Sequence, residues 1–207
     1  MCGRYSLLTE KEIIAIKEII RSLGKDIKDD IRTPKYQTEV YPTDIAPIMT
    51  IKENIVHLES AKWGFKTFHS NKAIINARYE TIAEKYMFKN LVFHNRCIIP
   101  APSFFEWAKI ETKKVKYLIK DQDDNLLFFA GLYRINPDNN QKEYVIITKE
   151  ATGDFAKIHN RVPLILRSEH LETWLNGNLS LNSANAIVVN LTFENISNST
   201  DLAALFD

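Results

Sequence analysis

A series of short apolar segments, separated by polar turns, constrains the fold of this 207-residue chain more than any other feature. The segments are rich in β-branched and aromatic residues, and turns such as residues 136–141 divide them. This pattern is typical of β-strands. We therefore predict strands over residues 2–8, 97–99, 115–120, 126–133, 144–148, 162–166 and 186–193.

Helices are expected to be few and short. Thr9 and Glu12 have the spacing of a capping box, and apolar residues then recur at helical spacing until Gly24, a typical helix stop. Further helices are predicted over residues 79–88, 151–157 and 168–175. The charged residues 25–35 are predicted to form a solvated loop. We expect residues 1–207 to form one strand-rich α+β domain, a barrel-like mixed sheet with peripheral helices.

Composition and motifs exclude several classes of protein. With 27 basic and 26 acidic residues, the net charge of +1 gives no global attraction to nucleic acid, although a local basic groove is compatible with it. Cys2 and Cys97 lie far apart, which argues against a disulfide framework or a cysteine-based zinc site. Motifs of nucleotide-binding proteins, zinc proteases and α/β-hydrolases are missing from the sequence. We expect no metal and no cofactor.

Hydropathy gives no sign of a membrane protein. No run of 18 apolar residues occurs, and charged residues interrupt the first 20 positions. Neither a transmembrane helix nor a secretory signal is therefore expected. We predict a cytoplasmic protein, a monomer without membrane partners.

Cys2 has distinctive chemistry once Met1 is removed, because its free α-amine and its thiol then share one Cα. The amine, with an ordinary pKa of about 8, can add to an aldehyde, and the thiol, with a pKa of about 8.5, can close onto the same carbon to give a thiazolidine. An internal cysteine cannot react in this way, since its nitrogen is an amide. The alternative is that a cysteine at position 2 has no chemical role.

Three other segments contain candidate site residues. Asn76 lies at a predicted strand-to-helix junction, where it either caps the helix or positions a carbonyl or phosphate group. Glu106 has aromatic residues on both sides, which would desolvate its carboxyl group, raise its pKa and suit it to general acid–base catalysis; the alternative is an outward-pointing strand residue. His159 precedes Asn160-Arg161 and suits a phosphate or leaving-group contact, although a lone histidine is more often structural.

Together these segments resemble the SOS-response-associated peptidase (SRAP) family. The matches run in family order across most of the chain and are specific in combination. They are Met1-Cys2-Gly3-Arg4-Tyr5, Ala46-Pro47, Trp63-Gly64, Asn76-Ala77-Arg78-Tyr79-Glu80-Thr81, Arg96-Cys97-Ile98-Ile99-Pro100-Ala101, Phe104-Phe105-Glu106-Trp107, Ala130-Gly131-Leu132 and His159-Asn160-Arg161-Val162-Pro163.

The resemblance implies a function in DNA damage. Members of the family crosslink covalently to abasic sites in single-stranded DNA, so the resemblance implies that this chain shields such lesions. It implies Cys2 as the nucleophile, with the companions Asn76, Glu106 and His159. For DNA binding we predict phosphate contacts from Arg4, Arg78 and Arg161 and stacking of Trp63 on a neighbouring base.

Two alternatives stay open at this point. One is a cysteine peptidase, acting at least on its own Met1, with Cys2 and His159 as nucleophile and base. The other is a non-covalent reader of modified DNA. On the main interpretation the partner is single-stranded DNA containing abasic sites, strand cleavage by a lyase step can follow capture, and the protein associates with the nucleoid when bound.

Overall fold

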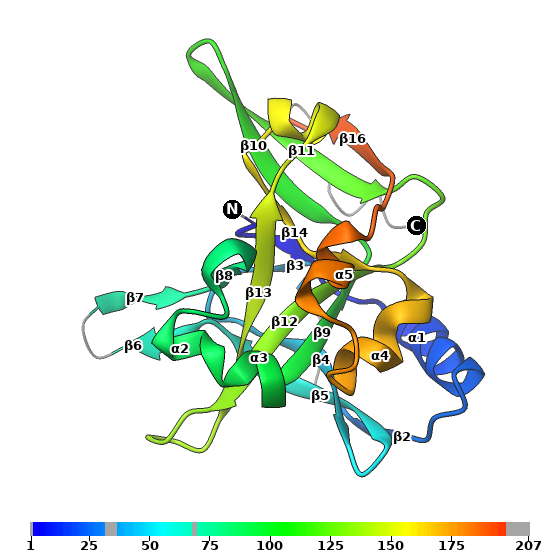
Figure 1. Cartoon of the computed structure of the whole chain (residues 1–207). Helices are drawn as coiled ribbons and strands as arrows, with labels where there is room; N and C mark the ends of the chain where they lie inside the picture. The colour runs from blue at the N-terminus through cyan, green and yellow to red at the C-terminus, as the bar shows by residue number, and fades with distance from the viewer. Residues whose placement is uncertain (1, 32–36, 68–69, 198–207) are drawn as a thin grey trace.

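A closed ring of strands forms the centre of the molecule (Figure 1). The computed structural model describes residues 2–31, 37–67 and 70–197. Within them, parallel pairing between β13 and β5 closes the sheet on itself. The predicted barrel-like sheet is thus confirmed. The ring consists of β13 (Lys142–Glu150), β12 (Leu127–Ile135), β9 (Arg96–Ala101), β4 (Ile45–Lys52) and β5 (Ile55–Trp63).

Shorter strands extend this ring at its edges. They are β2 (Ile27–Asp30), β8 (Asn76–Arg78), β14 (Arg161–Pro163) and β15 (Ile165–Leu166). Both β8 and β14 pair with β13, which therefore brings two candidate segments together. A separate hairpin joins β6 (Phe65–Thr67) to β7 (Ser70–Ile74).

A second sheet lies across one end of the ring, at the top of Figure 1. Its central strand is β10, which pairs with β1 on one side and with β11 on the other. The order of strands in this sheet is β3 (Glu39–Val40), β1 (Tyr5–Ser6), β10 (Phe104–Ile110), β11 (Lys113–Asp121) and β16 (Leu191–Asn195).

Helices lie outside the ring, as predicted (Figure 1). The α-helices are α1 (Glu10–Ser22), α2 (Tyr86–Lys89), α3 (Leu91–His94), α4 (Leu171–Leu175) and α5 (Leu181–Ala186). The 3₁₀ helices are η1 (Tyr79–Thr81), η2 (Gly153–Lys157) and η3 (Ser168–His170). Thr9 forms the predicted capping box with Glu12, and Gly24 follows the helix end with a φ of 68°. No described helix is both long and apolar enough to cross a membrane.

Several predicted boundaries are wrong. The helix predicted over residues 79–88 is divided into η1 and α2, because Lys85 has an extended backbone with a ψ of 124°. Within the loop predicted over residues 25–35, Ile27–Asp30 forms β2, parallel to β5, and Ile27 packs against the core. The strand predicted over residues 186–193 begins only at Leu191.

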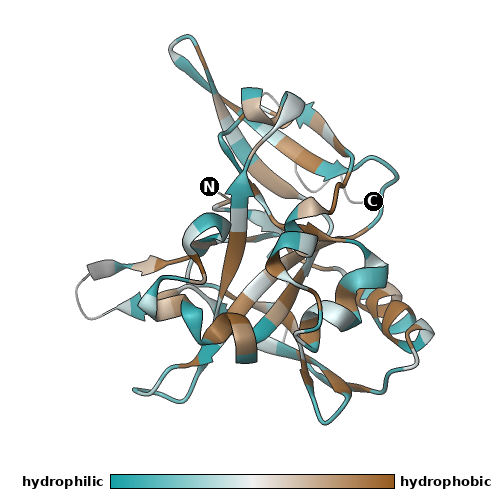
Figure 2. Ribbon diagram, in the orientation of Figure 1, coloured by the Kyte–Doolittle hydropathy of each residue, from teal (hydrophilic) through white to brown (hydrophobic). Residues whose placement is uncertain are grey.

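Apolar side chains cover both faces of the ring, and Figure 2 shows the hydrophobic colouring of its strands. In β9, Ile98 points to the core beneath α1 and α4, whereas Cys97 and Ile99 point to the opposite core with Cys2. This alternation follows from the two-residue period of a strand. Cys97 is fully buried, as expected of a small core residue.

Candidate active site

Cys2 lies fully buried just before β1. Its thiol donates a weak hydrogen bond of 3.8 Å to the carbonyl oxygen of Arg4, which also accepts one of 2.9 Å from the backbone N–H of Phe105. Tyr5 pairs with Phe104 in antiparallel register. Residues before Tyr5 therefore lie opposite those after Phe104, which brings the N-terminal segment beside Glu106.

Glu106 is a buried carboxyl group on β10, with 4% of its surface exposed. Burial raises its pKa, and nearby basic groups, His159 among them, partly oppose that shift. Burial also raises the pKa of the Cys2 thiol, and the charge of Glu106 adds to the increase. The predicted desolvation of Glu106 is confirmed, and the effect of its charge on the Cys2 thiol indicates that the two groups lie near each other.

Asn76 connects the ring to the N-terminal segment. Its side-chain Nδ2 donates a hydrogen bond of 2.9 Å to the backbone carbonyl oxygen of Cys2. Asn76 begins β8 opposite Ile146 of β13, so it does not cap a helix, and that alternative is wrong. The side-chain oxygen Oδ1 is buried without a hydrogen-bond partner among the described residues.

His159 follows η2 and leads into β14. Its Nδ1 accepts a hydrogen bond of 2.9 Å from the backbone N–H of Arg161. A neutral imidazole that accepts through Nδ1 carries its proton on Nε2 and can donate there. His159 is thus oriented by its own loop, and in its neutral form it is suited to donate a hydrogen bond to an oxygen atom.

A cavity of about 570 Å³ opens beside His159. Of the predicted site residues, His159, Arg78 and Arg161 line it. Cys2, Asn76 and Glu106 are not among its lining residues. The other residues that line the cavity are Glu80, Thr81, Glu150 and Asn160.

The three predicted phosphate-binding arginines lie in different environments. Arg161 forms a bidentate ion pair with Glu80, at 2.7 and 2.9 Å, and donates to the backbone oxygen of Thr148. Arg4 pairs with Glu39 at 3.2 Å. Arg78 is exposed and makes no ion pair with any residue that the structure describes.

Aromatic rings also hold Arg4. Its guanidinium carbon lies 4.3 Å from the centre of the Tyr41 ring and 4.9 Å from that of Trp107. Such cation–π contacts restrict the guanidinium group while leaving part of it exposed. Tyr41 itself is 42% exposed, so the stack lies at the surface.

Trp63 does not lie at the surface, and the prediction that it stacks on a DNA base is wrong. It has no exposed area, its Nε1 donates to the carbonyl oxygen of Ile75 at 3.0 Å, and its ring stacks against Tyr144. Trp63 is the last residue of β5, at the point where β13 closes the ring. Closure of the ring therefore buries its side chain.

Two features near the candidate site residues were not predicted from the sequence. Glu80 belongs to the segment that follows Asn76, but its partner Arg161 is 81 positions away. The buried hydroxyl groups of Tyr5 and Tyr144 are hydrogen-bonded to each other in the core that contains Cys2. Among the described residues, no group of three or more His, Cys, Asp and Glu side chains is arranged to hold a metal ion.

Comparisons with known proteins identify relatives of this chain. A family model described as SOS response associated peptidase (SRAP) matches residues 1–199. The abasic site processing protein YoqW of Bacillus subtilis is 33% identical over 187 residues, covering 85% of this chain and 80% of that protein. The abasic site processing protein YedK of Escherichia coli is 30% identical over 193 residues, covering 90% and 85%.

A crystal structure of a protein from Bacteroides thetaiotaomicron has the same fold, with a TM-score of 0.72 at 24% identity over 93% of this chain and 91% of that one. The family model extends over nearly the whole described chain, and both curated relatives share at least 30% of their aligned residues with it. The chain therefore belongs to the SOS response associated peptidase (SRAP) family.

Proposed function

We propose that this protein processes abasic sites in DNA by capturing them covalently through Cys2, after Met1 has been removed. The observation that carries the proposal is the grouping of Cys2 with Glu106 and Asn76 beside a cavity lined by Arg78 and His159. The relatives named as abasic site processing proteins support the substrate class.

The first step uses the α-amine of Cys2. An abasic sugar in its open form carries an aldehyde, and the amine adds to the aldehyde carbon. Loss of one water molecule then gives a Schiff base. Glu106, whose pKa is raised by burial, is suited to donate the proton that the departing hydroxyl group requires.

The second step uses the thiol. Because burial and the charge of Glu106 raise the pKa of Cys2, the sulfur holds its proton in this structure and needs a base. Glu106, ionised after the first step, accepts that proton while sulfur bonds to the imine carbon. The Schiff base left by the first step is the protonated iminium, so its C=N electron pair moves onto a nitrogen that already carries its proton, and a neutral five-membered thiazolidine results with no further loss of atoms.

The remaining residues position the sugar and the backbone. Asn76 fixes the carbonyl oxygen of Cys2 and so orients the amine and the thiol of the same residue. His159 is placed in our proposal against the sugar hydroxyl or the 3′ phosphate, and Arg78 against a flanking phosphate. At the Schiff-base stage, loss of a proton from C2′ would expel the 3′ phosphate, which is the proposed lyase activity.

Single-stranded DNA is the proposed form of the substrate, because the capture reaction needs only the aldehyde of the abasic sugar and no hydrogen bonds to a base pair. We further propose that the protein acts as a monomer in the cytoplasm and lies on the nucleoid while it holds the lesion. A cysteine peptidase would need His159 beside the Cys2 thiol. The effect of the Glu106 carboxylate on the Cys2 thiol supports the aldehyde chemistry, which needs a proton carrier at that position.

Intact mass spectrometry tests the proposal directly. The protein is measured alone and after incubation with single-stranded DNA that carries one abasic site. We expect the mass without Met1 and then an adduct equal to protein plus DNA less one water. Cys2→Ser should give no heat-stable adduct, although borohydride should still trap its Schiff base. A heat-stable adduct on untreated Cys2→Ser would refute the thiazolidine.

A further inference from the structure

Helices α2 and α3 present an exposed face of aromatic and basic side chains. Tyr86 is 88% exposed and Phe93 is 67% exposed, which are unusual values for large rings. No acidic residue belongs to this face, although Glu84 precedes it in the chain. The exposed members are Lys85, Tyr86, Lys89, Asn90, Phe93 and His94.

A cavity of about 330 Å³ adjoins this face. Tyr86 and Met87 of α2 form one wall, and Pro137 in the turn between β12 and β13 forms another. The volume lies at the lower end of the range of pockets that bind small organic molecules. The remaining lining residues are Lys66, Thr67, Arg134, Asn136 and Asp138.

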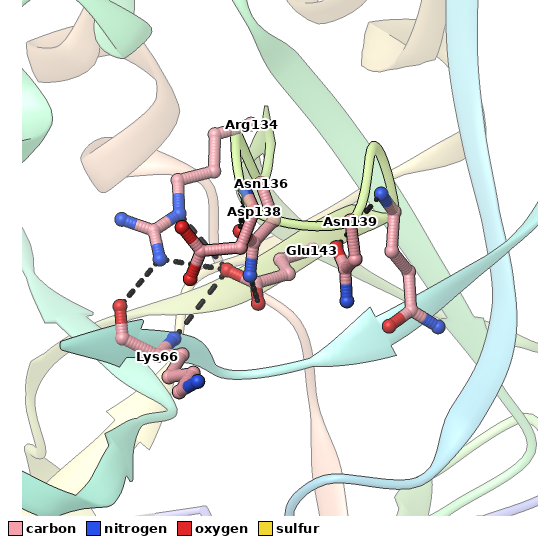
Figure 3. Close-up of polar contacts among 7 residues, drawn as sticks. Lys66, Arg134, Asn136, Asp138, Asn139 and Glu143 are labelled. Atoms are coloured by element: carbon pink, nitrogen blue, oxygen red, sulfur yellow. Dashed lines mark hydrogen bonds and ion pairs between the residues drawn. The ribbon is translucent and has the colours of Figure 1, made fainter.

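One wall of the cavity is held rigidly by a buried carboxylate, as Figure 3 shows. Glu143, 2% exposed, accepts hydrogen bonds from Arg134 at 2.7 and 2.9 Å and from Asn136 at 2.7 Å. Arg134 also donates to the backbone oxygen of Lys66 at 2.6 Å, which ties the turn to β6. The cavity is therefore formed in advance of any ligand.

The charged groups on this surface are mainly lysines that form no ion pairs within the described part of the chain. Lys66, Lys85 and Lys89 make no ion pair with any residue that the structure describes. The Lys89 ammonium group lies 5.6 Å from the centre of the Tyr86 ring. Asp138 is the acidic residue at the rim of the cavity. Aromatic rings among unpaired lysines are the features with which proteins bind single-stranded nucleic acid.

We propose that the α2–α3 face and its cavity form a second contact for single-stranded DNA, on the flank of the captured lesion. Tyr86 provides a stacking surface, the cavity receives a base, and Lys85 and Lys89 contact phosphates. The inference rests on the proposed function. Thr81 lines the cavity of about 570 Å³ beside His159, and Tyr86 follows five residues later, so at most about 18 Å of chain separates the two cavities.

The test uses the full chain and abasic single-stranded DNA with either short or long flanks on each side, about 3 against about 12 nucleotides, within the range that single-strand sites cover. For the parent, the DNA concentration for half-maximal crosslinking should fall when one flank is lengthened. On long-flank DNA, Tyr86→Ala should need a DNA concentration about 5-fold or more above that of the parent for half-maximal crosslinking, and Tyr86→Phe should match the parent. The maximal crosslinking rates of the parent and both variants should be equal.

Matched controls lie on the hairpin of β10 and β11, on either side of its turn. Ile110→Ala removes a side chain that is 49% exposed, and Lys113→Gln with Lys114→Gln removes two exposed charges. These variants should behave like the parent. By contrast, Lys85→Gln with Lys89→Gln should flatten the slope of log affinity against log salt by about 1.4 on long DNA.

Binding to undamaged long oligonucleotides separates this inference from the proposed function, because it needs no covalent step. Weaker binding of Tyr86→Ala to undamaged DNA would support the second contact even if the parent formed no crosslink. Equal affinity of Tyr86→Ala and the parent, on both damaged and undamaged long DNA, would overturn the inference and favour a protein contact for this face.

Discussion

Glu80 holds Arg161 in a bidentate ion pair on the wall of the cavity that His159 and Arg78 also line. The Arg161 side chain is 13% exposed, and it also donates to the backbone oxygen of Thr148. A guanidinium group held on two sides in this way orders the segment that leads from His159 into β14. Arg161 and Arg78 were both predicted to bind phosphates, and the structure gives a reason to separate them.

Replacing Arg161 by alanine should lower stability. The variant loses its hydrogen bonds to Glu80 and Thr148, and because Glu80 is 41% exposed we expect a cost of only about 1 kcal/mol, or about 2–4 °C in Tm. Arg161 lowers the pKa of Glu80. This stabilisation is present above the unfolded pKa of about 4.3 and is lost as the pH falls further, so the Tm difference should shrink in acid.

The corresponding Arg78→Ala variant should change binding and not stability. Arg78 is exposed and has no ion-pair partner among the described residues, so its removal leaves no buried charge. Loss of one phosphate contact should flatten the slope of log affinity against log salt by about 0.7 for single-stranded DNA. Salt titrations on undamaged DNA measure this. A lower Tm with an unchanged slope of log affinity against log salt would show that Arg78 stabilises the fold and does not bind phosphate.

Glu106→Gln should slow crosslinking by about 10² or more, because glutamine preserves the shape of the side chain but cannot transfer a proton. Single-turnover rates on abasic DNA, followed on denaturing gels, measure the effect. Glu106→Asp is the matched control, since it keeps an ionisable group at the position. If Glu106→Gln and the parent had equal rates across the pH range, Glu106 would have no role in proton transfer.

The same substitution should have the opposite effect on stability. Burial raises the pKa of Glu106 in the folded protein. A raised pKa means that stability is greatest below the unfolded value of about 4.3 and is lost as the pH rises through the folded value. Glu106→Gln cannot ionise, so its Tm should exceed that of the parent at alkaline pH and approach it in acid. A lower Tm at alkaline pH would contradict this sign.

Features set by neighbouring residues could be predicted from the sequence. The capping box of Thr9 depends on residues close in the chain, and it is confirmed. The predicted burial of Glu106 is also confirmed, although Phe105 and Trp107 pack together in a separate cluster and neighbouring side chains of a strand point to opposite faces. The strand-rich barrel follows from alternation and turns, which are also local.

Features set by closure of the ring could not be predicted in this way. Trp63 is buried because β13 pairs with β5, and no pattern around Trp63 indicates that pairing. The Glu80–Arg161 ion pair joins residues 81 positions apart for the same reason, since β8 and β14 both pair with β13. Residue type suggested that Trp63 is exposed and that Arg161 is free to bind phosphate. Strand pairing between distant parts of the chain overrides both expectations.

Asn76→Ala should slow crosslinking without abolishing it. The variant loses the 2.9 Å hydrogen bond to the Cys2 carbonyl oxygen, whose net value of about 1 kcal/mol corresponds to roughly a 5-fold slower reaction. The maximal rate should fall more than the affinity for undamaged DNA, because Asn76 positions Cys2. Asn76→Gln keeps the amide but moves it by one methylene, so it tests whether the position of the donor relative to the Cys2 carbonyl oxygen matters. Equal loss of affinity and rate would assign Asn76 to DNA binding.

Adding one residue before Cys2, or blocking removal of Met1, should eliminate covalent capture and leave non-covalent DNA binding largely intact. An acylated nitrogen cannot form a Schiff base, whereas the phosphate contact proposed for Arg78 comes from elsewhere in the chain. A cysteine peptidase would tolerate the extension, because an internal cysteine can still act as a thiolate with His159 as base. The extended protein is assayed on abasic DNA by denaturing gel and on undamaged DNA by equilibrium binding, with the parent as control. Efficient crosslinking by the extended protein would show that the α-amine of Cys2 is not the reacting group.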